Sequence, residues 1–275
     1  GGKVTNKKVG FIGVGNMGGA ILKAILRAEV VLPENVWATN RSPGKLAKIS
    51  DEFPIHVANT NEELVENADI IFVCVKPQDL LEVLEPLSTL IPASSVVISI
   101  AAGVGIKEIK KILHNNPQVV RVMPNTPVEI GKAVVGYASG DDAIVSESLI
   151  IELLKPLGLM VRVTEGDMLE GLTVSCASGT GFVFELMLYW QEWIEGYGFD
   201  PETAKKMAVQ TFLGAALQAE NSNGQSLDNL QARVVSKKGV TMAGLESMRE
   251  LDVERALRVS FEKAILRDRE LGKRI

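Results

Sequence analysis

The sequence predicts a protein of the α/β class, in which residues 1–164 form a domain with a parallel sheet and residues 165–275 form a second, all-helical domain. In the first part, short apolar runs alternate with segments of helical period, which is typical of parallel strands joined by crossover helices. From Glu165 onward the strand signal disappears, and helix-period sequence continues to the end of the chain. We therefore expect a change of architecture near residue 165.

The composition excludes several classes of protein. With 275 residues, of which 46% are hydrophobic, the chain is long enough for one large domain or two ordinary ones. Its net charge of -5 argues against a nucleic-acid surface. We expect no apolar run to be long enough to span a bilayer. The start at Gly1-Gly2 indicates a trimmed terminus, and no secretory signal is visible. We therefore predict a cytoplasmic protein with neither membrane nor nucleic acid as a partner.

Metal and thiol chemistry find little support in the sequence. Cys74 lies in an apolar run and Cys176 in a small-residue segment, so we expect both to be buried, reduced thiols. His56 and His114 fall at a strand edge or in a loop, and no Cys or His cluster has metal-ligand spacing. We expect no metal site, and catalysis by histidine is the weaker alternative.

The stretch from Val9 to Ala20 reads as a short apolar strand, a glycine turn and a helix. Gly13, Gly15 and Gly18 stand in G-x-G-x-x-G spacing, which suits a tight turn, a close approach of backbone to a pyrophosphate, and close packing of helix on strand. The helix N-terminus offers N–H groups and a partial positive charge to phosphates. In this context the pattern predicts a Rossmann dinucleotide-binding domain, with a purely structural glycine turn as the alternative.

The end of the next strand indicates which dinucleotide is bound. Asn40, Arg41 and Ser42 follow the predicted strand 36–39, and no Asp or Glu is present to hold a ribose 2′-OH. A guanidinium and a hydroxyl suit a 2′-phosphate instead. We therefore predict NADP(H) as the coenzyme, with NAD(H) left open as a second one. The alternative is a polar turn that leads into a helix at Pro43.

Three further strand ends predict positions near the coenzyme, because ligands bind at the carboxyl ends of parallel strands. Val75-Lys76-Pro77 ends the continuous apolar run that begins at Ile70. Ala101-Ala102-Gly103 ends another strand with small residues that leave room for a flat ring. Asn125-Thr126 stands between two prolines that fix φ, so we expect a rigid loop with two polar side chains.

The remaining elements follow from hydrophobic period and from breaker residues. The expected strands of the first domain are 9–13, 36–39, 55–57, 70–75, 96–100, 119–122, 133–137 and 160–163. The first expected helix of this domain starts after the glycine turn and ends near residue 28, and a short helix follows Asn61 and ends near Asn67. The other expected helices cover 43–52, the segment from 77 to about 90, 106–113 and 142–154. The expected helices of the second domain are 168–178, 182–196, 201–220, 225–234, 241–248 and 252–271.

The second domain contains one helix that predicts an oligomer. Asp200-Pro201-Glu202 is a clear helix start, with an N-cap residue, proline at the first position and an acid in the first turn. The preceding helix carries Trp190, Trp193 and other aromatic residues on all its sides, and such a helix requires burial all round. A domain of about 110 residues hardly provides it, so we expect a homodimer through these helices.

Taken together, these residues resemble the Δ1-pyrroline-5-carboxylate reductase family over nearly the whole chain. The most specific motif is Arg-Val-Met-Pro-Asn-Thr-Pro at 121–127. The other matching motifs are Gly-Phe-Ile-Gly-Val-Gly-Asn-Met-Gly at 10–18, Val-Lys-Pro at 75–77, Ala-Ser-Gly-Thr-Gly at 177–181, Gln-Thr-Phe-Leu-Gly-Ala-Ala at 210–216 and Val-Ser-Lys-Lys-Gly-Val-Thr-Met-Ala-Gly-Leu-Glu at 235–246.

The resemblance implies a Rossmann domain, a helical dimerisation domain, and assembly of dimers into a larger ring. It implies hydride transfer from NAD(P)H to the imine carbon of pyrroline-5-carboxylate, which gives L-proline. For the imino acid substrate it implies contacts with Ser236, Gly239, Thr241 and Thr180, and a hydrogen bond from Thr241 to the ring nitrogen as the catalytic contact. The coenzyme residues predicted from the motifs and the resemblance together are Gly13, Gly15, Asn16, Met17, Gly18, Asn40, Arg41, Ser42, Asn61, Val75, Lys76, Pro77, Ala101, Pro124, Asn125 and Thr126.

The sequence departs from the family where substrate is expected to bind. The family's Ser-Pro-Gly-Gly-Thr-Thr loop reads Ser-Lys-Lys-Gly-Val-Thr at 236–241, so a proline and a glycine are replaced by Lys237 and Lys238. Lys238 would be strained by about 1 kcal/mol if its position needs a positive φ. Alternatively, two added cations favour an anionic substrate. Two other functions therefore stay open, namely reduction of another cyclic imino acid and a regulatory role for a catalytically weak NADP-binding paralogue.

Other dehydrogenase classes fit less well. Short-chain dehydrogenases need Tyr-x-x-x-Lys, and none of the three tyrosines is followed by lysine four positions later. The 2-hydroxy acid dehydrogenases rely on a paired histidine, and no Gly-x-x-x-Asn-x-x-Lys helix typical of β-hydroxyacid dehydrogenases is found in the second half. A deazaflavin-linked NADP reductase shares the Rossmann start but lacks the long helical tail.

Overall fold

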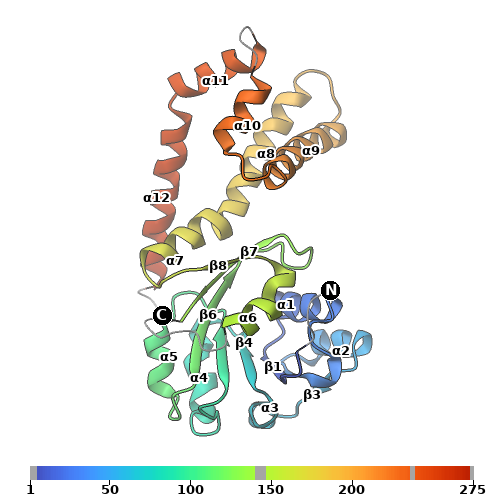
Figure 1. Ribbon diagram of the computed structural model, residues 1–275, viewed down its shortest axis with the longest axis vertical. Coiled ribbons are helices and arrows are strands. Elements are labelled where there is room, and N and C mark those ends of the chain that lie inside the picture. The colour runs from blue at the N-terminus through green and yellow to red at the C-terminus, as the bar shows by residue number, and fades with distance from the viewer. Residues whose placement is uncertain (1–4, 140–146, 236–238, 273–275) are drawn as a thin grey trace. The chain divides into compact units, whose positions relative to one another are not determined.

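The computed structural model of this chain describes residues 5–139, 147–235 and 239–272. The chain forms two compact units (Figure 1). The first, which we call the sheet unit, comprises residues 1–177 and 266–275, and the second, the helical unit, comprises residues 178–265. These units divide at 177/178, later than the predicted domain boundary at 164/165, and the last ten residues belong to the first unit. As a division by function, the boundary at 164/165 stays a prediction.

The sheet unit is built on an eight-stranded sheet in the order β3-β2-β1-β4-β5-β6-β7-β8. All neighbouring strands are parallel except β6 and β7, which are antiparallel. Between β1 and β4 the strand order reverses direction, so this is the switch point of the sheet. The strands are β1 Val9–Ile12, β2 Val36–Thr39, β3 His56–Val57, β4 Ile70–Val73, β5 Val96–Ser99, β6 Gln118–Pro124, β7 Ala133–Ala138 and β8 Gly158–Arg162.

Helices cover both faces of this sheet. One face packs against α1, α2 and α6, and the other against α3, α4, α5 and α7. The helices of this unit are α1 Asn16–Arg27, α2 Pro43–Glu52, α3 Asn61–Asn67, α4 Leu80–Leu84, α5 Ile106–Ile112, α6 Glu147–Leu154 and α7 Asp167–Leu172. Short 3-10 helices occur at Pro33–Asn35, Pro77–Asp79, Glu85–Leu87 and Lys155–Leu157, and a π-helix at Thr173–Ser178 follows α7.

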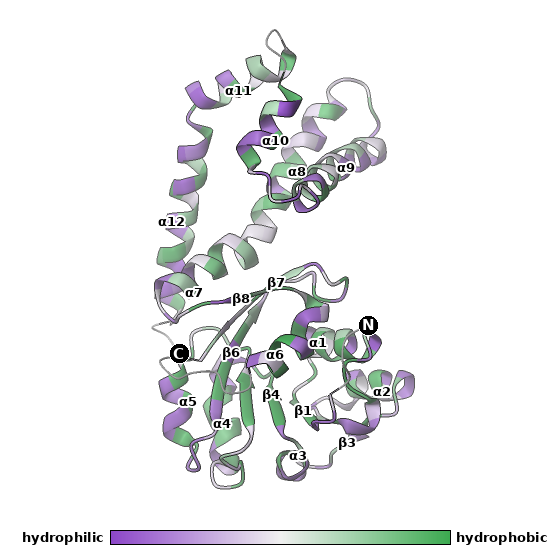
Figure 2. Ribbon diagram, in the orientation of Figure 1, coloured by the Kyte–Doolittle hydropathy of each residue, from purple (hydrophilic) through white to green (hydrophobic). Residues whose placement is uncertain are grey.

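The central strands β1 and β4 show why their sequence is a continuous apolar run. Phe11 and Phe72 face one layer of helices and stack on each other with ring centroids 4.5 Å apart, whereas Ile12 and Val73 face the other layer. A strand covered on both faces needs apolar side chains at every position. The hydropathy colouring shows the same contrast between apolar central strands and mixed outer helices (Figure 2).

The helical unit has a much smaller core. Among its described residues, the buried apolar cluster consists of Ile194, Ala204 and Ala208. Asp200 caps α9 by accepting the N–H of Thr203 at 3.0 Å, as predicted. The helices of this unit are α8 Gly179–Glu195, α9 Pro201–Glu220, α10 Leu227–Val234, α11 Val240–Glu250 and α12 Val253–Gly272, whose last turns belong to the sheet unit.

The structure corrects three sequence predictions. The helix expected up to about residue 90 is short, because Pro86 lacks an N–H and a 3-10 turn at Glu85–Leu87 follows α4. Strand β6 extends to Pro124, so this proline belongs to the strand and not to the loop. By length and composition alone, the helical segment Asp167–Glu195 could cross a membrane, and a single such segment is weak evidence for a membrane span. The expectation that no stretch would pass this test was wrong.

Candidate coenzyme site

The glycine turn between β1 and α1 has the geometry that a dinucleotide needs. Gly13 has φ +94°, and a Cβ at this position would lie 2.7 Å from the carbonyl oxygen of Cys74. A Cβ on Gly18 would lie 2.7 Å from that of Cys74, so the helix packs closely on the end of β4. A Cβ on Gly15 would meet nothing within 4 Å, so the backbone there borders open space. Turn, access and close packing are thus each served by one glycine.

A cavity of about 900 Å³ opens beside this turn, at the carboxyl ends of β1, β2 and β4. Arg41 and Lys76 give it positive charge, and Glu62 and Asp79 give it negative charge. Eight of the sixteen predicted coenzyme residues line it, namely Gly13, Gly15, Asn40, Arg41, Ser42, Asn61, Val75 and Lys76. The same cavity is also lined by five polar residues that were not predicted from the sequence, namely Thr39, Asn59, Thr60, Glu62 and Asp79.

Two asparagines of this cavity fasten the turn to its neighbours. The side chain of Asn40 accepts the N–H of Val14 at 3.2 Å and donates to the carbonyl of Ser42 at 2.8 Å. Asn61, the first residue of α3, accepts the hydroxyl of Thr39 at 2.8 Å. These bonds hold the ends of β1, β2 and α3 together. Both polar side-chain atoms of Asn40 and the amide oxygen of Asn61 are thus engaged within the protein, and direct contact of either residue with a ligand stays a prediction.

Arg41 is placed differently, because its side chain is 78% exposed. Its Nη1 lies 4.0 Å from Oδ2 of Asp79, a distance at which an exposed ion pair is weak. Ser42 is the N-cap residue of α2, but its side chain makes no capping hydrogen bond. A guanidinium and a hydroxyl therefore border the cavity together, as the 2′-phosphate prediction requires.

A second cavity of about 640 Å³ lies between α1, α2 and the loop after β6. The predicted coenzyme residues Asn16 and Thr126 line it, together with Gly15, which also borders the first cavity. Asn16 accepts a hydrogen bond from Lys45 at 3.1 Å, and Lys23 forms an ion pair with Glu129 at 2.8 Å. The Lys23 ammonium holds the pKa of the Glu129 carboxyl below its usual range. This ion pair links α1 to the loop that carries Thr126.

The loop after β6 uses one of its two polar side chains internally. Asn125 accepts the N–H of Val134 at 2.8 Å and donates to the carbonyl of Cys176 at 3.3 Å. It therefore ties β6 to β7 and to the π-helix, whereas Thr126 is exposed. Rigidity of this loop was predicted from its prolines, and the structure adds the asparagine as a second cause.

The remaining predicted residues border neither cavity. Met17 packs partly against the core, and Gly18 and Ala101 are buried. Pro77 and Pro124 are half-buried. Met17 and Gly18 contribute backbone N–H groups of the first turn of α1, which have no partner within the helix. Their place at the coenzyme stays a prediction.

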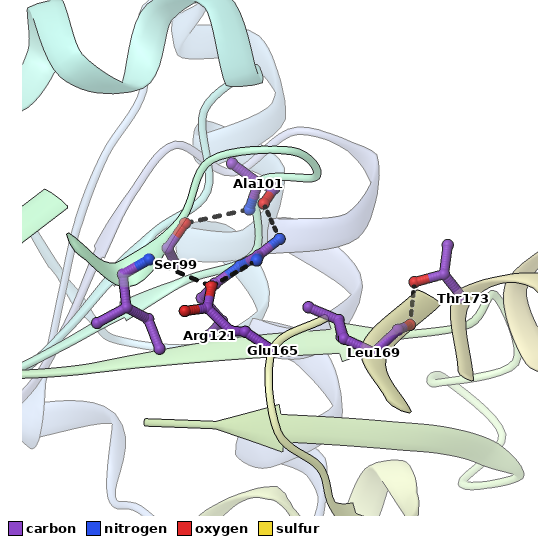
Figure 3. A network of polar contacts seen from close by, with 7 residues as sticks. Ser99, Ala101, Arg121, Glu165, Leu169 and Thr173 are labelled. Carbon is purple, nitrogen blue, oxygen red and sulfur yellow. Dashed lines mark hydrogen bonds and ion pairs between the residues drawn. The ribbon is translucent and has the colours of Figure 1, made fainter. Parts of the chain in front are cut away.

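An arginine is buried at the carboxyl end of the sheet, next to Ala101 (Figure 3). Arg121, in the middle of β6, is 6% exposed. Its Nη1 donates to Oε2 of Glu165 at 2.8 Å and its Nη2 to the carbonyl of Ala101 at 3.4 Å. The same Glu165 oxygen accepts the N–H of Ile106 at 3.2 Å. No role was predicted for this arginine, although a charged residue between the valines of a buried strand indicates that it needs a partner.

Thiol chemistry is not favoured at this site. Cys74 borders the first cavity, but burial raises the pKa of its thiol far above the usual range. A reactive cysteine needs a lowered pKa. Both cysteines are free thiols, and each residue as a whole is half-buried, whereas both were predicted to be buried. Among the residues that the structure describes, no group of three or more His, Cys, Asp or Glu side chains is arranged to hold a metal ion.

The predicted substrate residues belong to the helical unit. Thr180 lies in the first turn of α8 and is half-buried. Gly239 is the N-cap residue of α11 and Thr241 is exposed in its first turn. Ser236, together with Lys237 and Lys238, lies outside the described residues. The strain predicted for Lys238 is therefore untested.

A Rossmann sheet with this glycine turn and this polar cavity defines a dinucleotide-dependent oxidoreductase class. Within it, a family model described as "NADP oxidoreductase coenzyme F420-dependent" matches residues 8–103, and one described as "Pyrroline-5-carboxylate reductase dimerisation" matches residues 167–271. The chain is 33% identical to a pyrroline-5-carboxylate reductase of Methanosarcina acetivorans, over 98% of this chain and 99% of the relative. It is 30% identical to that of Pseudomonas aeruginosa, over 99% of each chain. The protein belongs to the pyrroline-5-carboxylate reductase family.

Solved structures agree with this assignment. A pyrroline-5-carboxylate reductase from Coxiella burnetii superposes with a TM-score of 0.88 at 29% identity, covering 97% of this chain and 99% of that one. A pyrroline carboxylate reductase from Plasmodium falciparum, solved with NADP bound, superposes with a TM-score of 0.81 at 25% identity, covering 98% and 100%. The predicted fold class and the predicted family are confirmed.

Proposed function

We propose that the protein reduces 1-pyrroline-5-carboxylate to L-proline with NADPH, the last step of proline biosynthesis. The observation that carries this proposal is similarity to named pyrroline-5-carboxylate reductases along the full chain, in both units. The glycine turn and its polar cavity support coenzyme binding in the sheet unit.

The coenzyme supplies a hydride when bound, and the protein's residues hold and orient it. In this proposal Gly15 and the first turn of α1 face the pyrophosphate with backbone N–H groups. Arg41 and Ser42 hold the 2′-phosphate. Val75, Lys76 and Pro77 border the middle of the coenzyme, and the small residues from Ala101 onward leave room for the nicotinamide. NADH lacks the group that Arg41 binds, so we expect it to serve less well.

The reaction requires a hydride at the C5 carbon and a proton on the ring nitrogen, which together convert the C=N bond to CH–NH. Thr241 is the residue that we propose to hydrogen-bond the ring nitrogen. Ser236, Gly239 and Thr180 complete the proposed contacts, with the substrate carboxylate at the N-terminus of α11, where a helix dipole favours an anion. Holding the coenzyme and the imine close together in the reacting orientation contributes to the rate in such a site.

The assembly proposed here is a cytoplasmic homodimer through the helical unit, with dimers joined into a larger ring. The match of residues 167–271 to a dimerisation model supports oligomerisation through this region. The exposed aromatic residues of α8 supply an apolar surface for it, and this interpretation accounts for the apolar length of Asp167–Glu195 without a membrane.

The proposal is tested by following NADPH and NADH oxidation with 1-pyrroline-5-carboxylate and with its six-membered homologue, piperideine carboxylate. We expect turnover of the five-membered ring with a preference for NADPH. Arg41→Ala should raise the KM for NADPH by about tenfold to a hundredfold, the effect of one charge-assisted contact, and leave the KM for NADH unchanged. Arg162→Ala, which removes an exposed arginine of β8 outside the cavity, is the matched control.

Two results would point elsewhere. Preferential reduction of the six-membered ring would favour a related cyclic imino acid reductase. NADPH binding without reduction of either imine would favour the catalytically weak paralogue. In that second case, Lys237-Lys238 is replaced by Pro-Gly. A gain of turnover would indicate that the loop has degraded, whereas loss of the remaining function would indicate that it has adapted.

A further inference from the structure

Packing of the sheet core does not require a charged residue at the position of the buried Arg121. This arginine lies between Val120 and Val122 in β6, where an apolar side chain would pack with less desolvation. A buried guanidinium is tolerated only where carboxylate and carbonyl groups pair with it. Glu165 provides the carboxylate, and Ala101 provides the carbonyl.

These contacts converge on one loop. The loop from Ala101 to Ile106 connects β5 to α5, and the pair holds it at both ends. Arg121 binds the carbonyl of Ala101, and Glu165 accepts the N–H of Ile106, the first residue of α5. The hydroxyl of Ser99 accepts the N–H of Ala101 at 3.2 Å, which fixes the start of the loop a second time (Figure 3).

The loop lies where the reactive end of the coenzyme is expected. Strand β5 neighbours β4, on the far side of the switch point from β2 and Arg41. A dinucleotide that spans the switch point with its 2′-phosphate at Arg41 extends its nicotinamide toward β4 and β5. Ala101 is buried, whereas Ala102 and Gly103 are exposed on the loop. Thus the segment that the ion pair fixes is the one that would face the ring.

We propose that Arg121 and Glu165 are positioning residues for the nicotinamide half of the coenzyme. By clamping the Ala101–Ile106 loop, the pair holds the surface on which the ring lies and so fixes the distance over which hydride is transferred. This inference rests on the proposed function for its reaction, and on the clamp geometry for its residues. Neither side chain needs to touch substrate or coenzyme.

The test compares wild type with Arg121→Lys, Glu165→Gln and the double variant. We expect kcat to fall by about tenfold to a hundredfold in each single variant, because small displacements of reacting atoms have effects of this size. The KM for NADPH should change by less than about threefold, since most binding contacts are retained. The deuterium isotope effect on kcat with 4-deuterated NADPH should rise, because hydride transfer becomes slower than other steps. In the double variant the losses should be less than multiplicative, as for two residues that act as one unit.

The fragment 2′,5′-ADP, which lacks the nicotinamide, separates positioning from general damage. We expect its Kd to be unchanged in the variants. Arg162→Lys is the matched control, because Arg162 forms an arginine–glutamate ion pair with Glu147 in the same unit but on its exposed surface. Unchanged kcat and isotope effect would overturn the proposal, and so would an equal loss of affinity for NADPH and 2′,5′-ADP. If Arg121→Lys does not fold, Glu165→Gln alone decides, because it keeps an acceptor for the N–H of Ile106.

Failure of the proposed function is distinguishable from failure of this inference. If wild type reduces neither imine, the fluorescence of bound NADPH reports the surroundings of the nicotinamide directly. A change of this emission in Glu165→Gln, with unchanged 2′,5′-ADP binding, would then support the clamp. Emission identical to that of wild type would overturn it.

Discussion

The two units of the molecule differ in how far they bury their large apolar side chains. In the sheet unit, large side chains such as Phe11 and Phe72 are fully buried between strands and helices of the same chain. In the helical unit, Trp193 is 66% exposed and Tyr197 is 70% exposed. Both units are rich in apolar residues, so the difference lies in where the partners are found. The sheet unit contains its own core, whereas the helical unit leaves large apolar side chains exposed.

This contrast indicates which unit depends on oligomerisation for its stability. Large exposed apolar patches mark interaction sites in soluble proteins, and the dimerisation model matches this part of the chain. A unit with three buried core residues among those described gains little free energy from its own packing. We therefore expect the sheet unit to be stable at any protein concentration and the helical unit to depend on association, which is linked to concentration.

The largest expected effect comes from placing a charge on the exposed face of α8. Trp193→Glu should abolish dimerisation, because burying an unpaired carboxylate in an apolar interface costs several kcal/mol. We expect a monomer by light scattering, loss of helical signal in circular dichroism, and loss of nearly all turnover.

Leu159→Glu is the control for this variant. Leu159 is 64% exposed, about as much as Trp193, but it lies in β8 of the sheet unit. We expect it to leave the dimer intact. A Trp193→Glu protein that remains dimeric and active would place the interface elsewhere.

A cavity in the sheet core should destabilise the protein without affecting dimerisation. Phe72→Ala removes a fully buried ring that stacks on Phe11, and we expect a loss of about 3–5 kcal/mol in the free energy of unfolding. Hydrogen exchange should accelerate in β1 and β4 by the same amount at low and high protein concentration. Exchange in α8 should instead depend on concentration in the wild type. If protection of β1 also depends on concentration, the sheet unit is not independent of association.

Much of this architecture could be predicted from the sequence, because local signals determine it. The continuous apolar runs predicted the central strands, and Asp200 with Pro201 predicted the start of α9. The prediction of a helix up to residue 90 was wrong, because Pro86 interrupts the helical pattern. The compact units could not be located from period alone, because the last turns of α12 join the sheet unit through long-range contacts such as Arg269 with Glu170.

Residues of the candidate site that belong to a motif were predicted from the sequence. Residue pairs that are distant in the sequence and meet only in the folded chain were not. Gly13, Gly15 and Arg41, which spacing and strand ends single out in the sequence, line the cavity, and their contact with the coenzyme stays a prediction. Asp79 reaches Arg41, and Glu165 reaches Arg121, over separations of 38 and 44 residues that no local pattern encodes. Asn40 and Asn125 have internal hydrogen bonds that only the folded structure reveals.

The smallest expected effect concerns a carboxyl group at the end of α12. Burial and the nearby Glu170 carboxylate raise the pKa of Asp268 above its ordinary value of 3.8, although Arg121 opposes this. The folded state therefore favours protonated Asp268, and this contribution to stability is lost as the pH rises through the raised pKa. Asp268→Asn keeps the shape without the charge. We expect it to raise the melting temperature at pH 7 by at most about 2 °C, a modest gain for a partly exposed group, and the gain should shrink toward pH 4.

Asp200 in the helical unit makes this comparison sharper, because its pKa moves in the opposite direction. The N–H and hydroxyl groups of Thr203 lower the pKa of Asp200, so its stabilising contribution is present above the ordinary pKa and is lost as the pH falls through the lowered one. Asp200→Ala should therefore destabilise the protein at neutral pH and make less difference in acid. Thermal melts of both variants from pH 4 to pH 7 should show differences of opposite sign from wild type. Differences of the same sign would mean that overall charge, rather than these local contacts, governs the response to pH.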